Sequence, residues 1–212
     1  MKKAVVATWL AVAGSLFAGY VSAGPVLLIT PTSSHVDVGQ VARINVSISG
    51  LDAEVLSSFD LNFIYDSSVV RLDAANLSGA DDALGSAFGA PPLVFSDSAV
   101  DGNYGVLGQA LADDATLIAN QQDAFLLFQF DFVGMANGMT TLSLGANADF
   151  ERSFIGLNFA ALQGVSIQGA CVAVGTGSCS SSSELPEPAS AVLAAAAGLA
   201  ACGSRLRRRQ SP

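Results

Sequence analysis

The side chains with the clearest potential for chemistry alternate along one short stretch of the chain, at Asn147, Asp149 and Glu151. Alternate residues of a β-strand point to the same face, so these three side chains could share one cation. Carboxylate and amide oxygens are the ligands that Ca²⁺ takes in proteins. The spacing matches no recognised calcium loop, and a solvated acidic face explains the same pattern. Calcium is therefore the one cofactor that the sequence suggests.

Residues suited to catalysis are scarce. The single histidine, His35, lies in a polar segment between two expected strands, which is typical of a solvated surface residue. The sequence contains no nucleophile elbow, HExxH pair, phosphate-binding loop or dinucleotide fingerprint. Two of the many acidic side chains could still meet in the fold as a glycoside-hydrolysing pair. A second cluster of oxygen ligands, at Asp97, Asp101 and Asn103, has the same two interpretations as the first. We expect a protein that is not an enzyme.

The charge of the chain is unevenly distributed. Between Gly24 and Leu185 there are three arginines and no lysine, against seventeen Asp and Glu residues, which gives a net charge of −14. Such a surface repels phosphate backbones and anionic lipid headgroups. The composition therefore excludes nucleic acid as a partner.

The N-terminal residues have the order of a secretory signal peptide. Lys2 and Lys3 provide a basic start, residues 4–19 are almost uninterruptedly apolar, and residues 21–23 read Val-Ser-Ala. Small residues directly after the apolar run mark a cleavage site, although a permanent N-terminal anchor is the alternative. We expect a signal peptide over residues 1–23 and, with it, export and cleavage by a signal peptidase.

The expected export to an oxidising compartment bears on the three cysteines of the chain. Cys171 and Cys179 lie close together in the sequence, and two nearby cysteines in an oxidising compartment more often pair than stay free. A disulfide between them is the expectation, with two unpaired thiols as the alternative. Cys202 lies in an apolar run and is expected to behave as a small hydrophobic residue.

Most of the remaining chain shows period-two alternation. The segments 41–49, 58–66 and 123–134 alternate apolar and polar residues, and the last is partly apolar on both sides. This pattern predicts β-strands. Shorter strand candidates, separated by turn residues, are 26–30, 69–72, 93–96, 104–111, 140–144 and 164–174.

The number of these strands sets the fold class. Helical periodicity is weak, and only residues 76–88 could hold a helical turn or two. Eight or nine short strands with frequent turns predict an all-β antiparallel sandwich over residues 24–177. A serine-rich linker follows at residues 178–185.

The C-terminal segment combines a rigid acidic tripeptide, an apolar run and a basic end. Residues 189–204 number sixteen, a helix of about 24 Å, against a hydrocarbon core of about 30 Å. The sequence thus predicts a short transmembrane helix, with a plain tail anchor or a helix packed on the domain as alternatives. The arginines would fix its orientation on the cytoplasmic side. The residues concerned are Pro186, Glu187 and Pro188 before the run, and Arg205, Arg207, Arg208 and Arg209 after it.

The body resembles the cohesin family. The stretch VDVGQVARINVSISGL is followed by LSSFDLNFIYDSSVVRLDA, and a long aromatic strand then precedes TTLSLG. In cohesins, an opening of the form V-x-x-G-x-x-x-x-V-x-V precedes F-x-L-x-Y-D-x-x-V. The resemblance implies a nine-stranded jelly-roll β-sandwich related to carbohydrate-binding modules.

The C-terminal segment, residues 186–209, resembles the PEP-CTERM sorting signal of Gram-negative bacteria. The Pro-Glu-Pro tripeptide, the apolar helix and the arginine cluster carry this likeness. The resemblance implies processing by the membrane enzyme exosortase. It also implies a precursor held transiently in the inner membrane and a mature protein at the cell surface or in the extracellular matrix.

These observations lead to one functional expectation and two alternatives. We expect a non-catalytic structural or adhesive protein within exopolysaccharide or biofilm matrix. A cohesin-type module that docks a dockerin-like protein would show a flat, partly apolar sheet face. A carbohydrate-binding module would show exposed aromatic residues on a face or at loop tips, and Tyr104 is the best candidate for such a residue.

Overall fold

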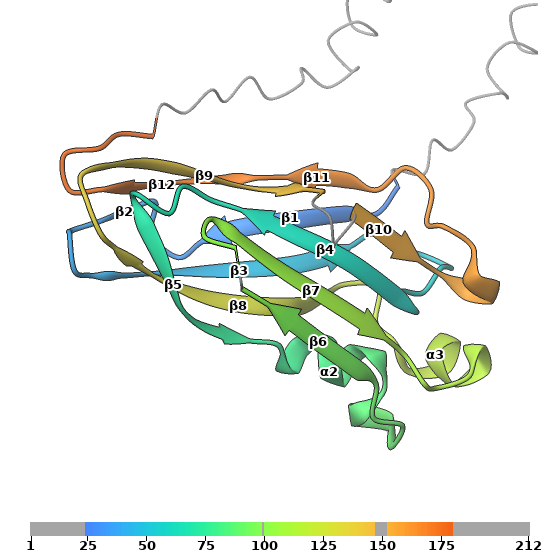
Figure 1. The fold of residues 1–212 in the computed structure, drawn as a ribbon. Helices are drawn as coiled ribbons and strands as arrows, with labels where there is room; N and C mark the ends of the chain where they lie inside the picture. Colours follow the sequence, from blue (N-terminus) through green and yellow to red (C-terminus); the bar gives the residue numbers. More distant parts are fainter. Residues whose placement is uncertain (1–23, 99, 147–151, 180–212) are drawn as a thin grey trace, which may run out of the picture. The chain divides into compact units, whose positions relative to one another are not determined.

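The protein is described by a computed structural model over residues 24–98, 100–146 and 152–179. Two β-sheets face each other and enclose one hydrophobic core (Figure 1). The all-β sandwich expected from the sequence is confirmed. Within the described ranges, no helix is long and apolar enough to cross a membrane.

The first sheet has five strands in the order β11-β1-β3-β8-β5. Its long central pair, β3 and β8, is antiparallel and carries a bulge after Val46. Its strands are β1 (Val26–Pro31), β3 (Val41–Ser49), β5 (Val70–Asn76), β8 (Phe125–Gly134) and β11 (Ser166–Gln168).

The second sheet has seven strands, six of them in the order β2-β12-β9-β4-β7-β6. The seventh strand, β10, pairs with the first half of β4, while β9 pairs with its second half. The strands are β2 (His35–Val36), β4 (Ser58–Ile64), β6 (Leu93–Asp97), β7 (Asn103–Gln109), β9 (Gly138–Gly145), β10 (Arg152–Ile155) and β12 (Ala170–Val174).

Among the described residues, four short helical segments lie in the connections. They are α2 (Ser78–Leu84) and the 3₁₀ turn η1 (Ser86–Phe88) between β5 and β6, α3 (Asp114–Asn120) between β7 and β8, and the turn η2 (Leu157–Phe159) after β10. The sequence anticipates the first two but not α3. Its start is fixed locally, because the Asp113 carboxylate accepts a hydrogen bond of 2.7 Å from the Thr116 amide. The same bond lowers the pKa of Asp113 below its ordinary value.

The alternation in the sequence appears directly as alternating burial. In β3, Ile44, Val46 and Ile48 are fully buried, while the residues between them are partly exposed. Each strand therefore turns its apolar side chains toward the opposite sheet.

Aromatic rings fill the space between the sheets. Phe128 of β8 packs edge-on against Phe59 and Phe63 of β4, with ring centroids 5.4 and 5.8 Å apart. Such edge-to-face pairs add to the stabilisation from burial alone. Gly108 lies opposite Phe59 in the β4–β7 register, and a Cβ atom there would collide with the Phe59 ring.

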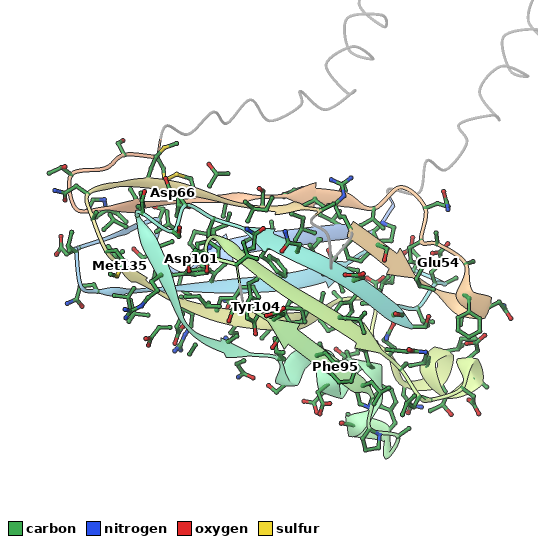
Figure 2. The ribbon with its side chains drawn as sticks, viewed as in Figure 1. Glu54, Asp66, Phe95, Asp101, Tyr104 and Met135 are labelled. Carbon is green, nitrogen blue, oxygen red and sulfur yellow. A yellow bond between two sulfur atoms is a disulfide. The ribbon has the colours of Figure 1, made fainter. Side chains whose placement is uncertain are left out.

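Tyr104 belongs to this core, contrary to the expectation from the sequence. It is the second residue of β7, lies opposite Phe63 and is 7% exposed. Its ring packs edge-on against Phe130 at 5.3 Å (Figure 2 labels Tyr104). The turn ends before it, so strand alternation directs the side chain inward.

The single strand expected over residues 164–174 is two strands in different sheets. β11 pairs with β1, and β12 pairs with β9 and β2. The chain crosses between the sheets at Gly169, where a side chain would meet the carbonyl oxygen of Leu142. The β1–β11 and β2–β12 pairs are parallel, so the end of the domain closes against its beginning.

Candidate binding surface

The outer side of β4, β7 and β6 presents a row of apolar side chains. The register places Phe95 opposite Leu107, and Leu107 opposite Asp60, on the same face of three adjacent strands. Leu93 lies on this face one row further along β6. Phe95 is 58% exposed and Leu93 is 44% exposed (Figure 2 labels Phe95). We call this surface, made of Leu93, Phe95 and Leu107, the β6 face.

The position of the β6 face is as informative as its composition. Among the described strands, β6 pairs with β7 alone and ends the sheet. Native proteins usually protect such an edge with charge, proline or short length. Here the edge strand carries two exposed large apolar residues, Leu93 and Phe95, which is typical of a surface that meets another molecule.

Further along the same side of the sheet, two polar side chains form a hydrogen bond. Asn62 of β4 is fully buried and donates from Nδ2 to Oδ1 of Asn103 at 2.9 Å. Neighbouring Ile64 is 37% exposed. The β6 face therefore lies on the same side of the sheet as a hydrogen-bonded pair of polar side chains.

The outer face of the other sheet is different in character. Arg43 of β3 and Asp131 of β8 form a bidentate ion pair at 2.7 and 2.8 Å. Next to them, Gln129 Nε2 donates to Asn45 Oδ1 at 3.1 Å. The hydrogen bond from Arg43 holds the pKa of Asp131 below its ordinary value. These polar groups satisfy one another, and Phe95 of the β6 face is more exposed than any large apolar residue of β1, β3 or β8.

A hollow of about 560 Å³ adjoins the β6 face at the ends of its strands. Ser58, Gln109 and Ile155 form one row across β7, β4 and β10, next to Leu93, and they line this hollow. Phe159 of η2 stands at its rim and is 85% exposed.

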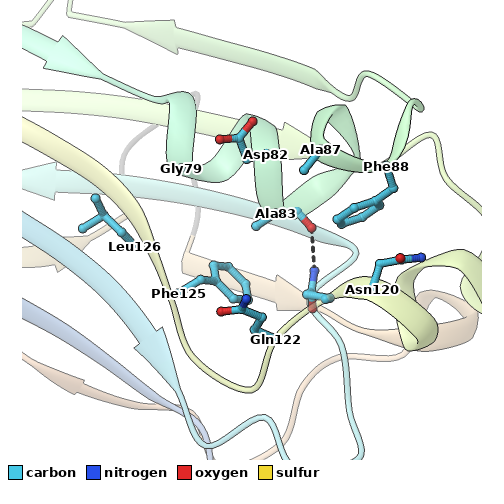
Figure 3. A pocket seen from close by; sticks show the side chains of 10 residues that line it. Gly79, Asp82, Ala83, Ala87, Phe88, Asn120, Gln122, Phe125 and Leu126 are labelled. Carbon is cyan, nitrogen blue, oxygen red and sulfur yellow. Dashed lines mark hydrogen bonds between the residues drawn. The ribbon is translucent and has the colours of Figure 1, made fainter.

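A second hollow, of about 390 Å³, lies between α2, η1 and the start of β8. Figure 3 shows Phe88 and Phe125 lining it. Gln121 also lines this hollow, and its side chain makes three hydrogen bonds within the domain. Its side chain accepts from the Leu56 amide at 2.6 Å and donates to the carbonyl oxygens of Leu56 and Ala83 at 2.9 and 3.0 Å.

The structure places only some of the site residues expected from the sequence. Cys171 and Cys179 are joined by a disulfide bond. The other expected site residues lie outside the described ranges: Asn147, Asp149 and Glu151; Pro186, Glu187 and Pro188; and Arg205, Arg207, Arg208 and Arg209. Residues 1–23, expected to be a signal peptide, also lie outside them.

The described acidic residues do not gather into a metal site. In the part of the chain that the structure covers, no group of three or more His, Cys, Asp or Glu side chains could hold a metal ion. Asn103, a candidate calcium ligand with Asp97 and Asp101, accepts the hydrogen bond from Asn62. His35 is an exposed residue of β2.

Comparison with known proteins shows which solved structures share this architecture. No protein-family model and no curated protein sequence matches the chain. Solved structures of cohesins do match. The second type II cohesin module from the adaptor ScaA scaffoldin of Acetivibrio cellulolyticus has a TM-score of 0.59 at 12% identity. The match covers 77% of this chain and 97% of that one.

Two further cohesins show the same similarity. The seventh ScaB type I cohesin from Pseudobacteroides cellulosolvens has a TM-score of 0.55 at 15% identity, over 74% of this chain and 96% of that one. The cohesin module from a family 33 glycoside hydrolase of Clostridium perfringens has a TM-score of 0.54 at 13% identity. This match covers 74% of the present chain and 99% of the Clostridium perfringens module. The fold is thus the cohesin-type β-sandwich.

Proposed function

We propose that this domain is a non-catalytic docking module that binds a partner protein through the β6 face. The observation that carries the proposal is the pair of exposed apolar residues Leu93 and Phe95 on an edge strand, with the partly buried Leu107 beside them on the neighbouring strand. The cohesin-type fold supports it, since similar structures include the sixth cohesin from scaffoldin B of Acetivibrio cellulolyticus in complex with the Cel5 dockerin.

The charge around the β6 face defines the partner's chemistry. Asp60 and Asp97 lie on the same side of the sheet as Phe95. The chain between residues 24 and 185 carries a net charge of −14. Complementary potentials favour specific association and suppress wrong partners. The partner is a protein that presents apolar side chains surrounded by Lys or Arg, and a dockerin-like domain is one form it can take.

A capture experiment with matched variants tests this function. The purified protein is immobilised and exposed to the extracellular and envelope fractions of its source organism, with calcium or with a chelator. A specific partner binds the wild type and Leu28→Asp, a control on the outer face of the other sheet. Binding of this partner is lost in Phe95→Asp. Calorimetry with the purified partner gives the same order: wild type and Leu28→Asp bind, and Phe95→Asp does not. Equal binding of that partner to Phe95→Asp would refute the proposal.

We further propose that the chain is exported and sorted. The basic and apolar order of residues 1–23 supports removal of a signal peptide, and residues 178–185 form a serine-rich linker to the tail. The Pro-Glu-Pro tripeptide and arginine cluster of residues 186–209 support processing by an exosortase at the inner membrane. The mature module would then act at the cell surface or in exopolysaccharide or biofilm matrix, in a structural or adhesive role.

Intact-mass analysis of the native protein tests the sorting proposal. The expected mature species begins near Gly24 and has lost the tail near Pro186. A species that begins near Gly24 but retains residues 205–209 would contradict sorting, while leaving the docking proposal untouched.

A further inference from the structure

Phe159 combines two features that are both unfavourable for stability. Its ring is 85% exposed, the largest fraction among the exposed large apolar residues of the described chain. Its backbone lies in the left-handed region at φ 58°, directly after Asn158 at φ 53°. Asparagine tolerates this region, but a bulky residue there is a true outlier. Strained residues of this kind persist where the surrounding structure holds them, and they cluster at functional sites.

The surrounding structure holds this loop firmly. The Gly156 amide donates to the Ala160 carbonyl oxygen at 2.7 Å, and the Ala160 amide donates to that of Leu157 at 3.0 Å. The Asn158 amide donates to Oδ2 of Asp114 at 3.2 Å, which ties the loop to α3. The backbone that carries the ring is therefore held in one conformation before any ligand arrives. A preorganised group loses less entropy on binding than a flexible one.

The hollow beside the ring carries groups that both donate and accept hydrogen bonds. In the described part of the chain, no hydrogen bond involves the side-chain amides of Gln109 or Asn158, and both residues line the hollow. Asp114 contributes a carboxylate to the same wall. The hydroxyls of Ser57 and Ser58 donate to backbone carbonyl oxygens, so their oxygens remain available as acceptors.

We infer that this hollow, with the Phe159 ring as its platform, is a binding site for a neutral oligosaccharide. A sugar offers an apolar face of C–H groups to an aromatic ring and a rim of hydroxyls that donate and accept. A cationic side chain of a protein could use the ring, Asp114 and the amide oxygens, but it has no acceptor for the N–H donors of Gln109 and Asn158, whereas sugar hydroxyls both donate and accept.

Charge and size narrow the ligand further. The net charge of −14 between residues 24 and 185 disfavours anionic polysaccharides such as uronates. A volume of about 560 Å³ lies within the ordinary range of small-molecule sites, about 300–1,000 Å³. It accommodates a few sugar residues of a longer chain, because the hollow is open at the surface.

Titration of the purified protein with soluble oligosaccharides tests the inference. The probes are cellotetraose, mannotetraose and laminaritetraose, with tri-galacturonic acid as the anionic comparison, followed by calorimetry and amide chemical shifts. At least one neutral probe is expected to bind with a dissociation constant on the order of 0.1–1 mM. Phe159→Ala is expected to weaken binding at least tenfold, and Phe159→Tyr to preserve it. Gln109→Ala is expected to weaken it several-fold, and circular dichroism confirms that each variant is folded.

The control variant separates this site from the docking surface. Phe95→Ala, which alters the β6 face, should leave sugar binding unchanged, and Phe159→Ala should leave capture of the protein partner unchanged. Three results would overturn the inference: no neutral probe binds at 10 mM, binding is equal in Phe159→Ala, or Phe159→Ala loses the protein partner instead of the sugar.

Discussion

Replacement of Gln121 by alanine should destabilise the domain far more than the same change at the adjacent Gln122. The Gln121 side chain connects three parts of the chain, because it follows α3 and bonds both Leu56 and Ala83. Leu56 is fully buried, so removal of the side chain leaves its backbone groups in a buried position without their hydrogen-bond partner. Gln122 is exposed, and no hydrogen bond of its side chain occurs within the described residues.

The magnitude follows from the three hydrogen bonds, of 2.6, 2.9 and 3.0 Å. Each contributes about 0.5–1.5 kcal/mol net, and a buried group left unsatisfied costs about 1–3 kcal/mol. Gln121→Ala should therefore lower the free energy of unfolding by about 2–4 kcal/mol. A change of 1 kcal/mol shifts Tm by about 2–4 °C in a domain of this size class, so the expected loss in Tm is about 5–15 °C. Gln122→Ala should stay within about 0.5 kcal/mol of the wild type.

Urea unfolding followed by circular dichroism measures both variants, since the single tryptophan, Trp9, precedes the domain. Hydrogen exchange gives an independent readout, because the Leu56 amide should lose protection in Gln121→Ala and keep it in Gln122→Ala. If the two variants unfold at the same urea concentration, the side-chain bridge contributes nothing and the reasoning is wrong.

Three further predictions concern other parts of the domain. Asp131→Asn should lower the free energy of unfolding by no more than about 1 kcal/mol at pH 7, because the ion pair with Arg43 is half exposed. The pKa of Asp131 is lowered in the folded state, so the ion pair stabilises above the unfolded pKa of about 3.9. The difference between variant and wild type should vanish as the pH falls through the folded pKa. Gly108→Ala should lower the free energy of unfolding by about 1–3 kcal/mol, because the new methyl group displaces the buried Phe59 ring; an unchanged urea midpoint would contradict this. Phe159→Gly should raise the free energy of unfolding by about 0.5–1 kcal/mol through relief of the left-handed backbone, and a decrease would mean that the ring packs on the domain.

The fold could be predicted from the sequence because each long strand has one buried face. Alternation marks such strands directly, as in β3, where every second residue is buried. Residues 164–174 show the limit of this reasoning. The pattern there is strand-like throughout, but the crossing at Gly169 depends on contact with Leu142, which is distant in the sequence.

The candidate sites were harder to predict from the sequence for the same reason. In β6, Leu93 and Phe95 point outward and Val94 points inward, yet all three are apolar, so the pattern cannot tell the exposed side from the buried one. Phe159 carries no sequence signal at all. Its left-handed backbone is set by hydrogen bonds with other segments, including the one to Asp114. A strand was expected from Tyr104 onward, but its short pattern, interrupted by two glycines, did not show that the first side chain faces the core.

The parallel closure of the domain has a mechanical consequence. Val26 at the start of β1 lies opposite Ser49, whereas Val174 at the end of β12 lies against Gly134, near Val41. These points mark opposite ends of the nine-residue strand β3, about 26–27 Å apart. A pull on the two ends of the domain would run along the strands. The hydrogen bonds of β1 and β12 would then resist together in shear rather than open one after another, which suits a module that carries tension between two attachments.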